Sequence, residues 1–205
     1  MFERIHSGFE KISRVSVWVG GGALMLAAIM VTIDVFSRKL FSVTMSGSDE
    51  ISGYVFAAAT TWGYSYCLLN RANIRIDALY NNLGRMTQAV LDLVALLLLF
   101  IYVYILATKA VGVFQETVEY NATAQTTLAT PLWMPQLLWV AGLLFFLLTL
   151  AFVTVYTAVS LLKRDLTTLN RIAGVRTIEE EVAQETEGTE ARTAHGVSID
   201  PKGDR

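Results

Sequence analysis

The chain has 205 residues, of which 54% are hydrophobic and 17% are charged, and its mean hydropathy is +0.48. A soluble domain carries roughly 25% charged residues, so this composition indicates a membrane protein. The 16 basic and 18 acidic residues give a net charge of −2, which offers no basic face for nucleic acid. The single cysteine, Cys67, excludes an internal disulfide and a thiolate metal cluster.

Four apolar stretches are long enough to cross a bilayer as helices. The hydrocarbon core is about 30 Å thick and a helix rises about 1.5 Å per residue, so a span needs roughly 20 mostly apolar residues. We therefore predict an all-α membrane protein with one transmembrane domain over residues 15–165. Its four predicted spans cover residues 15–36, 51–69, 88–107 and 135–162. The first span resembles a signal peptide in its basic flank, but its apolar run is too long and no A-x-A site follows, so we expect a retained helix.

The basic residues beside the spans predict the orientation, because cytoplasmic flanks carry an excess of Lys and Arg. One side of the predicted bundle holds Arg4, Lys11, Arg14, Arg71, Arg75, Arg85, Lys163, Arg164, Arg171 and Arg176, and the other holds Arg38, Lys39 and Lys109. Both termini are thus expected in the cytoplasm, which agrees with an even number of spans.

The two ends of the chain differ from the spans. In residues 1–14 the large apolar residues are spaced three, four and three apart, and therefore share one helical face: Phe2, Ile5, Phe9 and Ile12. An amphipathic helix in the headgroup plane explains this pattern, and so does a frayed terminus or an extension of the first span. Residues 166–205 are expected to form a cytoplasmic tail, which becomes acidic after about residue 176 and is predicted to be disordered there.

The segment between the third and fourth spans is too polar for lipid. Helical character should continue to about Tyr120, and the sequence NATAQTTLATP then breaks the pattern. Pro135 suits the first turn of the fourth helix, where its missing N–H has no partner in any case. Trp133 and Trp139 are predicted to be anchors at headgroup depth, where an indole keeps its ring apolar and its N–H wet.

Few side chains near the membrane can carry chemistry. Asp34 precedes Arg38 by four residues, which predicts an ion pair at the outer interface. Asp92, near the start of the third span, suits the positive end of a helix. Pairing or capping is therefore expected of both, rather than ion translocation. No span carries a histidine, a pair of aspartates or a Ser–His arrangement, so we expect no enzyme, no metal site and no cofactor.

Features for helix packing are plentiful by contrast. Small residues let two helix backbones approach closely in a membrane. The predicted packing residues are Gly20, Gly21 and Gly22 in the first span and Gly53, Ala57, Ala59 and Gly63 in the second. Whether their partners lie within this chain or in another subunit is left open by the sequence.

Four segments form a set of short motifs. DVFSRKLF has an arginine followed by two bulky apolar residues, and SGSDEISGYVF has a small polar residue and an acidic pair at a helix start. WGYSYCLLNRANIRIDAL has a glycine-containing second helix, an arginine and a short apolar–acidic run, and TPLWMPQ leads into the fourth span. In these segments the chain resembles the DctQ-type small membrane subunit (Q subunit) of tripartite ATP-independent periplasmic (TRAP) transporters. The family often has a histidine at the position of Asn73, and Asn cannot gain a proton near neutral pH. The resemblance covers about residues 1–165 in total.

The resemblance implies a scaffold in the inner membrane that binds a large membrane subunit (M-type) in the lipid bilayer and helps dock a periplasmic solute-binding receptor. The large subunit would carry the sites for sodium and for an organic acid. Residues of the outer loop, Arg38, Ser48, Asp49 and Glu50, would organise the turn or contact the receptor. Arg71, Asn73 and Asp77 would organise the cytoplasmic turn and hold the large subunit. Arg71 is equally explained as an anchor at the lipid headgroups.

Two other classes of function stay open. One is a free-standing four-helix membrane adaptor. The other is the small anchor subunit of a respiratory or redox complex.

Overall fold

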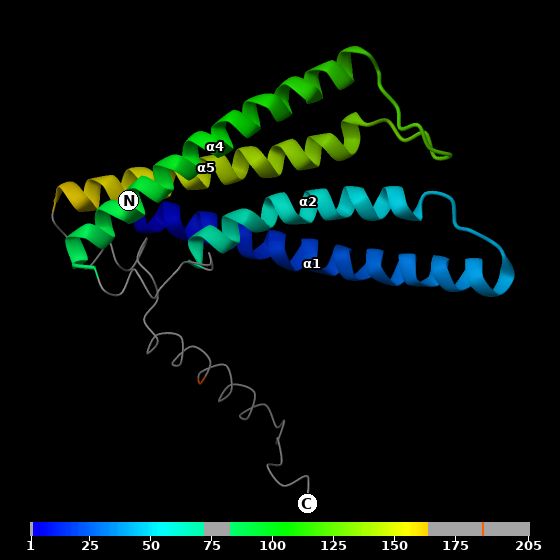
Figure 1. The fold of residues 1–205 in the computed structure, drawn as a ribbon, viewed down its shortest axis with the longest axis horizontal. Coiled ribbons are helices and arrows are strands. Elements are labelled where there is room, and N and C mark those ends of the chain that lie inside the picture. The colour runs from blue at the N-terminus through cyan, green and yellow to red at the C-terminus, as the bar shows by residue number, and fades with distance from the viewer. Residues whose placement is uncertain (1, 72–82, 164–185, 187–205) are drawn as a thin grey trace, which may run out of the picture.

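The computed structural model describes residues 2–71, 83–163 and 186. Within these residues lie four helices: α1 (Phe2–Phe41), α2 (Ser48–Leu69), α4 (Arg85–Glu119) and α5 (Trp133–Leu162). They form two antiparallel hairpins, one of α1 and α2 and one of α4 and α5 (Figure 1). The hairpins meet through α2 and α5, so the packing order is α1, α2, α5, α4. This arrangement is an open row of helices.

We call the end of the molecule with the loops of residues 42–47 and 120–132 the distal end (Figure 1). Helix α2 there begins after Gly47, whose φ of 93° lies in the left-handed region. At the ends of α1, α2 and α4 the chain also enters that region, at Ser42, Arg71 and Asn121. Asn121 N–H donates to Val118 O and Ala122 N–H to Thr117 O, which is the Schellman pattern that closes a helix end.

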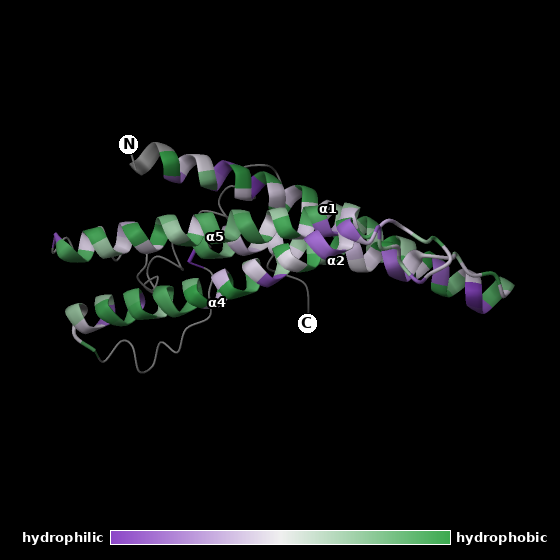
Figure 2. Cartoon of the chain, turned by 90° about the horizontal axis from the view of Figure 1, so that it is seen from above, coloured by the Kyte–Doolittle hydropathy of each residue, from purple (hydrophilic) through white to green (hydrophobic). Residues whose placement is uncertain are grey.

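Three of the helices are long and apolar enough to cross a membrane, over Ile5–Phe41, Met86–Glu119 and Trp133–Leu162. Figure 2 shows the apolar residues that dominate α4 and α5. The predicted second span lies in α2, which contains many hydroxyl and small residues and is not among these three helices. Its role as a span stays a prediction.

The predicted helix boundaries differ from the observed ones chiefly at the N-terminus. Residues 2–14 belong to the same unbroken helix as the first predicted span, as in the extension alternative. Helix α4 ends at Glu119, close to the predicted Tyr120, and Pro135 lies in the first turn of α5 as expected. The proposed tail, residues 166–205, lies outside the described residues apart from Thr186.

The buried face of α1 repeats every seven residues, a spacing that keeps side chains on one side of a helix over several turns. Its fully or almost fully buried members are Ser13, Ala27 and Asp34, and Gly20 occupies the remaining heptad position. The main apolar core lies elsewhere, between α2, α4 and α5, and contains Leu68, Leu96, Val103, Phe146, Leu150 and Val153.

Candidate functional site

The loop between α1 and α2 is organised around the carboxylate of Asp34. Only 1% of this residue is exposed. It accepts hydrogen bonds from the Arg38 guanidinium at 2.7 Å and from the Ser48 hydroxyl at 3.1 Å. The backbone N–H of Met45 and the hydroxyl of Thr44 also donate to it. The Asp34–Arg38 pair predicted from the sequence is therefore present, and it sits inside a larger network that joins α1, the loop and α2.

The predicted outer-loop residues have different environments in this network. Arg38 pairs with Asp34, and its side chain is still 55% exposed. Ser48 is buried at the start of α2, whereas the next residue, Asp49, is exposed in the first helical turn. A carboxylate there interacts favourably with the positive end of the helix.

Glu50 connects α2 to the loop of residues 120–132. One carboxylate oxygen accepts a hydrogen bond from the Tyr54 hydroxyl at 2.7 Å, and the other accepts one from the Thr126 hydroxyl. The bond from Thr126, followed by that from Tyr54, holds the pKa of the Glu50 carboxyl below its ordinary value, because both stabilise the charged form.

The same loop packs against Gly47. A Cβ added to Gly47 would overlap the Leu128 side chain, and the φ of 93° at this position is one that residues with a Cβ rarely adopt. The backbone conformation therefore favours glycine at this position, and the Leu128 side chain, which is 45% exposed, would have to shift to make room for a Cβ. The sequence analysis did not single out Gly47 or Leu128, because their contact joins residues far apart in the chain.

The predicted packing residues divide into two groups. A Cβ on Gly20 would lie 3.1 Å from Ala59 Cβ, so α1 and α2 approach closely there. Ala57 lies two residues before Ala59 in α2, and its carbonyl oxygen accepts a hydrogen bond from Thr61. By contrast, nothing lies within 4 Å of the Cβ that would be added at Gly21, Gly22, Gly53 or Gly63.

Gly142, which the sequence patterns did not single out, lies where α2 and α5 approach each other closely. A Cβ on Gly142 would lie 2.5 Å from Thr61 Oγ1 and 2.8 Å from Trp62 Cδ1. Trp62 also donates its indole N–H to Leu138 O at 3.0 Å and stacks on Phe145. These contacts hold the two hairpins together near the middle of α2.

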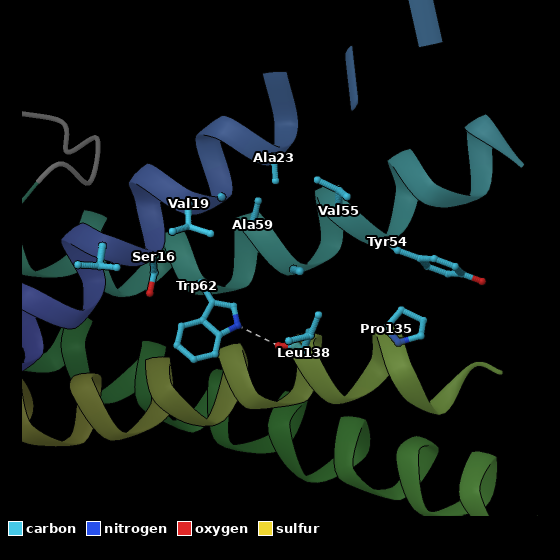
Figure 3. Close-up of a pocket in the computed structure, with 12 residues that line it drawn as sticks. Ser16, Val19, Ala23, Tyr54, Val55, Ala59, Trp62, Pro135 and Leu138 are labelled. Atoms are coloured by element: carbon cyan, nitrogen blue, oxygen red, sulfur yellow. Dashed lines mark hydrogen bonds between the residues drawn. The ribbon is translucent and has the colours of Figure 1, made fainter. Parts of the chain in front are cut away.

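Next to this contact lies an apolar groove of about 440 Å³ between α1 and α5, which we call the α1–α5 groove. Helix α1 forms one wall and α5 the other, and small residues of α2 form the floor (Figure 3). Its lining includes Val15, Val19, Ala23, Val55, Ala58, Ala59, Trp62, Pro135 and Leu138. Beyond the groove, Phe9 of α1 contacts the rings of Phe145 and Phe152 in α5.

The remaining predicted residues lie at the other end or outside the described part of the chain. Arg71 follows α2 with a φ of 53°, and its N–H donates to Leu68 O at 3.2 Å. Asn73 and Asp77 lie outside the described residues. Trp133 begins α5 and is 41% exposed, whereas Trp139 packs partly against the buried cluster of Ala110, Val140 and Leu143.

The described side chains include few groups that could bind a metal ion or act as a nucleophile. Among residues 2–71 and 83–163, no group of three or more His, Cys, Asp or Glu side chains could hold a metal ion. Cys67 is exposed on α2. The described part of the chain combines hydrogen-bonded loops at the distal end, close helix contacts and an apolar groove.

Comparisons with known proteins identify the family. No curated protein matches the chain. Residues 12–164 match the model of the DctQ component of tripartite ATP-independent periplasmic transporters. This match covers all four helices apart from the first turns of α1. The chain is therefore a membrane protein of the DctQ family, a TRAP transporter small subunit.

Proposed function

We propose that this chain is the scaffold on which the large membrane subunit of its transporter assembles, and that it helps dock a solute receptor. The large subunit then carries out sodium-coupled uptake of an organic acid. The observation that carries the proposal is the family match over residues 12–164, which makes the chain one component of a tripartite system. The chain itself performs no reaction in this scheme.

We place the contact with the large subunit on the exposed face of α1. Only 11% of the apolar window of α1 is buried within the chain, compared with 44% of that of α5. Gly21 and Gly22 lie on this helix with no neighbour near their Cβ positions. A glycine inside a helix costs about 1 kcal/mol relative to alanine, a cost that a closely packed neighbouring helix offsets.

In the proposed orientation the protein lies in the bacterial inner membrane with both termini in the cytoplasm. The distal end, with the Asp34 network, then faces the periplasm. Its basic residues Arg38, Lys39 and Lys109 are fewer than those expected at the opposite end, as the positive-inside rule requires. Asp49 and Arg38 are the exposed charged groups that we expect to meet the receptor.

Co-purification with the large subunit tests the scaffold. The tagged chain is co-expressed with the large permease from its own gene neighbourhood and purified in mild detergent. We expect a stable one-to-one complex. If the chain purifies alone and folded, the scaffold proposal is wrong.

A pair of matched variants tests the proposed face. Gly21→Leu places a large side chain on the exposed face of α1, and Gly112→Leu makes the same change on α4, where nothing lies within 4 Å of the added Cβ. Gly21→Leu should reduce the amount of co-purified large subunit and Gly112→Leu should not, while both chains remain folded. If both variants co-purify with the same amount of large subunit, the large subunit does not contact this part of α1.

A further inference from the structure

The two helical hairpins are joined along much of their length. Toward the end opposite the distal end, Leu68 of α2 packs in the core with α4 and α5, and Phe9 of α1 contacts Phe145 and Phe152 of α5. Near the middle, α2 and α5 meet through Trp62, Thr61 and Gly142. Toward the distal end α1 and α2 extend past the start of α5, so the helices themselves no longer meet (Figure 1). The loop of residues 120–132 crosses this gap and reaches the start of α2. We call this loop the strap.

The strap has a defined internal structure. Thr123 and Pro131 form an isolated β-bridge, and Ala124 N–H donates to Thr130 O at 2.9 Å. Leu132 N–H donates to Ala122 O at 3.1 Å, so the two ends of the strap are fastened to each other. At its tip Ala129 N–H donates to Thr126 O at 3.1 Å. Backbone groups that are paired in this way hold the tip in one shape.

The tip contacts the other hairpin through an apolar and a polar contact. Leu128 fills the space left by the missing side chain of Gly47. Thr126 donates to Glu50, and the other oxygen of Glu50 accepts from Tyr54, which lines the α1–α5 groove. A continuous chain of contacts therefore runs from the strap through Glu50 to the groove.

We propose that the strap is a conformational clamp that sets the separation of the two hairpins at the distal end, and with it the width of the adjoining part of the α1–α5 groove. The contact between α2 and α5 acts as the pivot, because it lies near the middle of α2. Releasing Leu128 from Gly47 and Thr126 from Glu50 lets the distal ends of the hairpins move apart while the pivot stays closed. This inference concerns the chain alone and does not rest on the transport proposal.

Distances between spin labels in the full chain, reconstituted in lipid, test the clamp. All labelled chains also carry Cys67→Ser, which removes the native cysteine so that only the introduced cysteines take a label. One label pair, Lys39→Cys with Lys109→Cys, reports the distal separation of α1 and α4. A second pair, Lys11→Cys with Thr87→Cys, reports the opposite end. All four sites are exposed.

In each labelled background the strap is weakened by Thr126→Val, which removes the hydroxyl and keeps the side-chain shape, or by Leu128→Ala. Thr127→Val makes the same change at the neighbouring exposed residue and is the control. We expect both strap variants to broaden the distal distance distribution and shift it to longer distances, with the control and the second label pair unchanged. An unchanged distal distribution, or equal broadening at both ends, would overturn the proposal.

Disulfide trapping keeps the test decisive if a strap variant does not fold. Glu50→Cys with Thr126→Cys, in the Cys67→Ser background, should crosslink when an oxidant is added, and the crosslinked chain should keep a narrow distal distribution. Glu50→Cys with Thr127→Cys should crosslink much more slowly. Equal crosslinking rates for the two cysteine pairs would show that the tip of the strap does not contact α2 as described.

Discussion

The hydroxyl of Ser48 donates a hydrogen bond to the carboxylate of Asp34 at 3.1 Å, and both residues are almost completely buried. They lie on different helices, Asp34 about two turns before the end of α1 and Ser48 at the start of α2. Because the same carboxylate also binds Arg38 and the Met45 N–H, one acceptor fixes the end of α1, the loop and the first turn of α2. The turn at the distal end is thus held by one buried carboxylate.

Removing the Asp34 carboxylate should destabilise the chain more than removing its exposed partner. We expect Asp34→Asn to lower the midpoint of thermal unfolding in detergent further than Arg38→Ala, since a half-exposed ion pair contributes only about 0–1 kcal/mol. Ser48→Ala removes one buried hydrogen bond and should cost about 1 kcal/mol. An equal decrease in the unfolding midpoint for Arg38→Ala and Asp34→Asn would contradict this ranking.

Gly142→Ala should weaken the contact between the hairpins. The added Cβ would lie 2.5 Å from Thr61 Oγ1 and 2.8 Å from Trp62 Cδ1. Overpacking of this kind typically costs about 1–3 kcal/mol. Gly63→Ala, where nothing lies within 4 Å, is the control and should stabilise the isolated chain by up to about 1 kcal/mol. Thermal unfolding of both variants measures the difference, and a neutral Gly142→Ala would contradict the packing described.

The interaction free energy between Leu128 and Gly47 can be measured with a double-mutant cycle. Gly47→Ala should be destabilising because of both the overlap with Leu128 and the φ of 93°. Leu128→Ala should be destabilising because it removes the side chain that packs against Gly47. Since Leu128→Ala also removes the overlap, the double variant should lose less stability than the two single losses together. Strict additivity would show that the two residues do not interact.

The bonds to Glu50 predict a loss of stability in acid. The hydrogen bonds from Thr126 and Tyr54 lower the pKa of Glu50 in the folded chain below its ordinary value of 4.5. The folded chain then binds fewer protons than the unfolded chain as the pH falls below this value. The stabilisation is therefore complete above pH 4.5 and is lost as the pH falls through the lowered pKa.

Unfolding measured at a series of pH values checks this contribution. Glu50→Gln should flatten the decrease in stability below pH 4.5, and Thr126→Val should reduce it, since the Thr126 bond is the largest cause of the shift. An unchanged slope in Glu50→Gln would show that other groups are responsible.

Much of the fold could be predicted from the sequence, because it depends on local patterns. Apolar runs located the helices, and the spacing of Asp34 and Arg38 within one helix predicted their ion pair. The end of α4 was predicted within one residue. In each case the deciding interactions lie within a few turns of the chain.

What could not be predicted depends on how helices distant in sequence face one another. Three consecutive glycines in α1 are equivalent in the sequence, yet Gly20 is the one that lies against Ala59, because a helix turns about 100° per residue. The role of Gly47 depends on Leu128, which lies beyond α2 and α4 in the sequence. Asp34 was expected to pair with Arg38, but its bonds to Ser48 and to the Met45 N–H depend on the loop conformation.

The proposal that this chain is a required scaffold can be tested by transport itself. Uptake of an organic acid is measured in proteoliposomes that contain the large subunit, with the loaded receptor outside and an inward sodium gradient. We expect uptake when this chain is present and little or none when it is omitted. Uptake at the full rate by the large subunit and receptor alone would contradict the proposal.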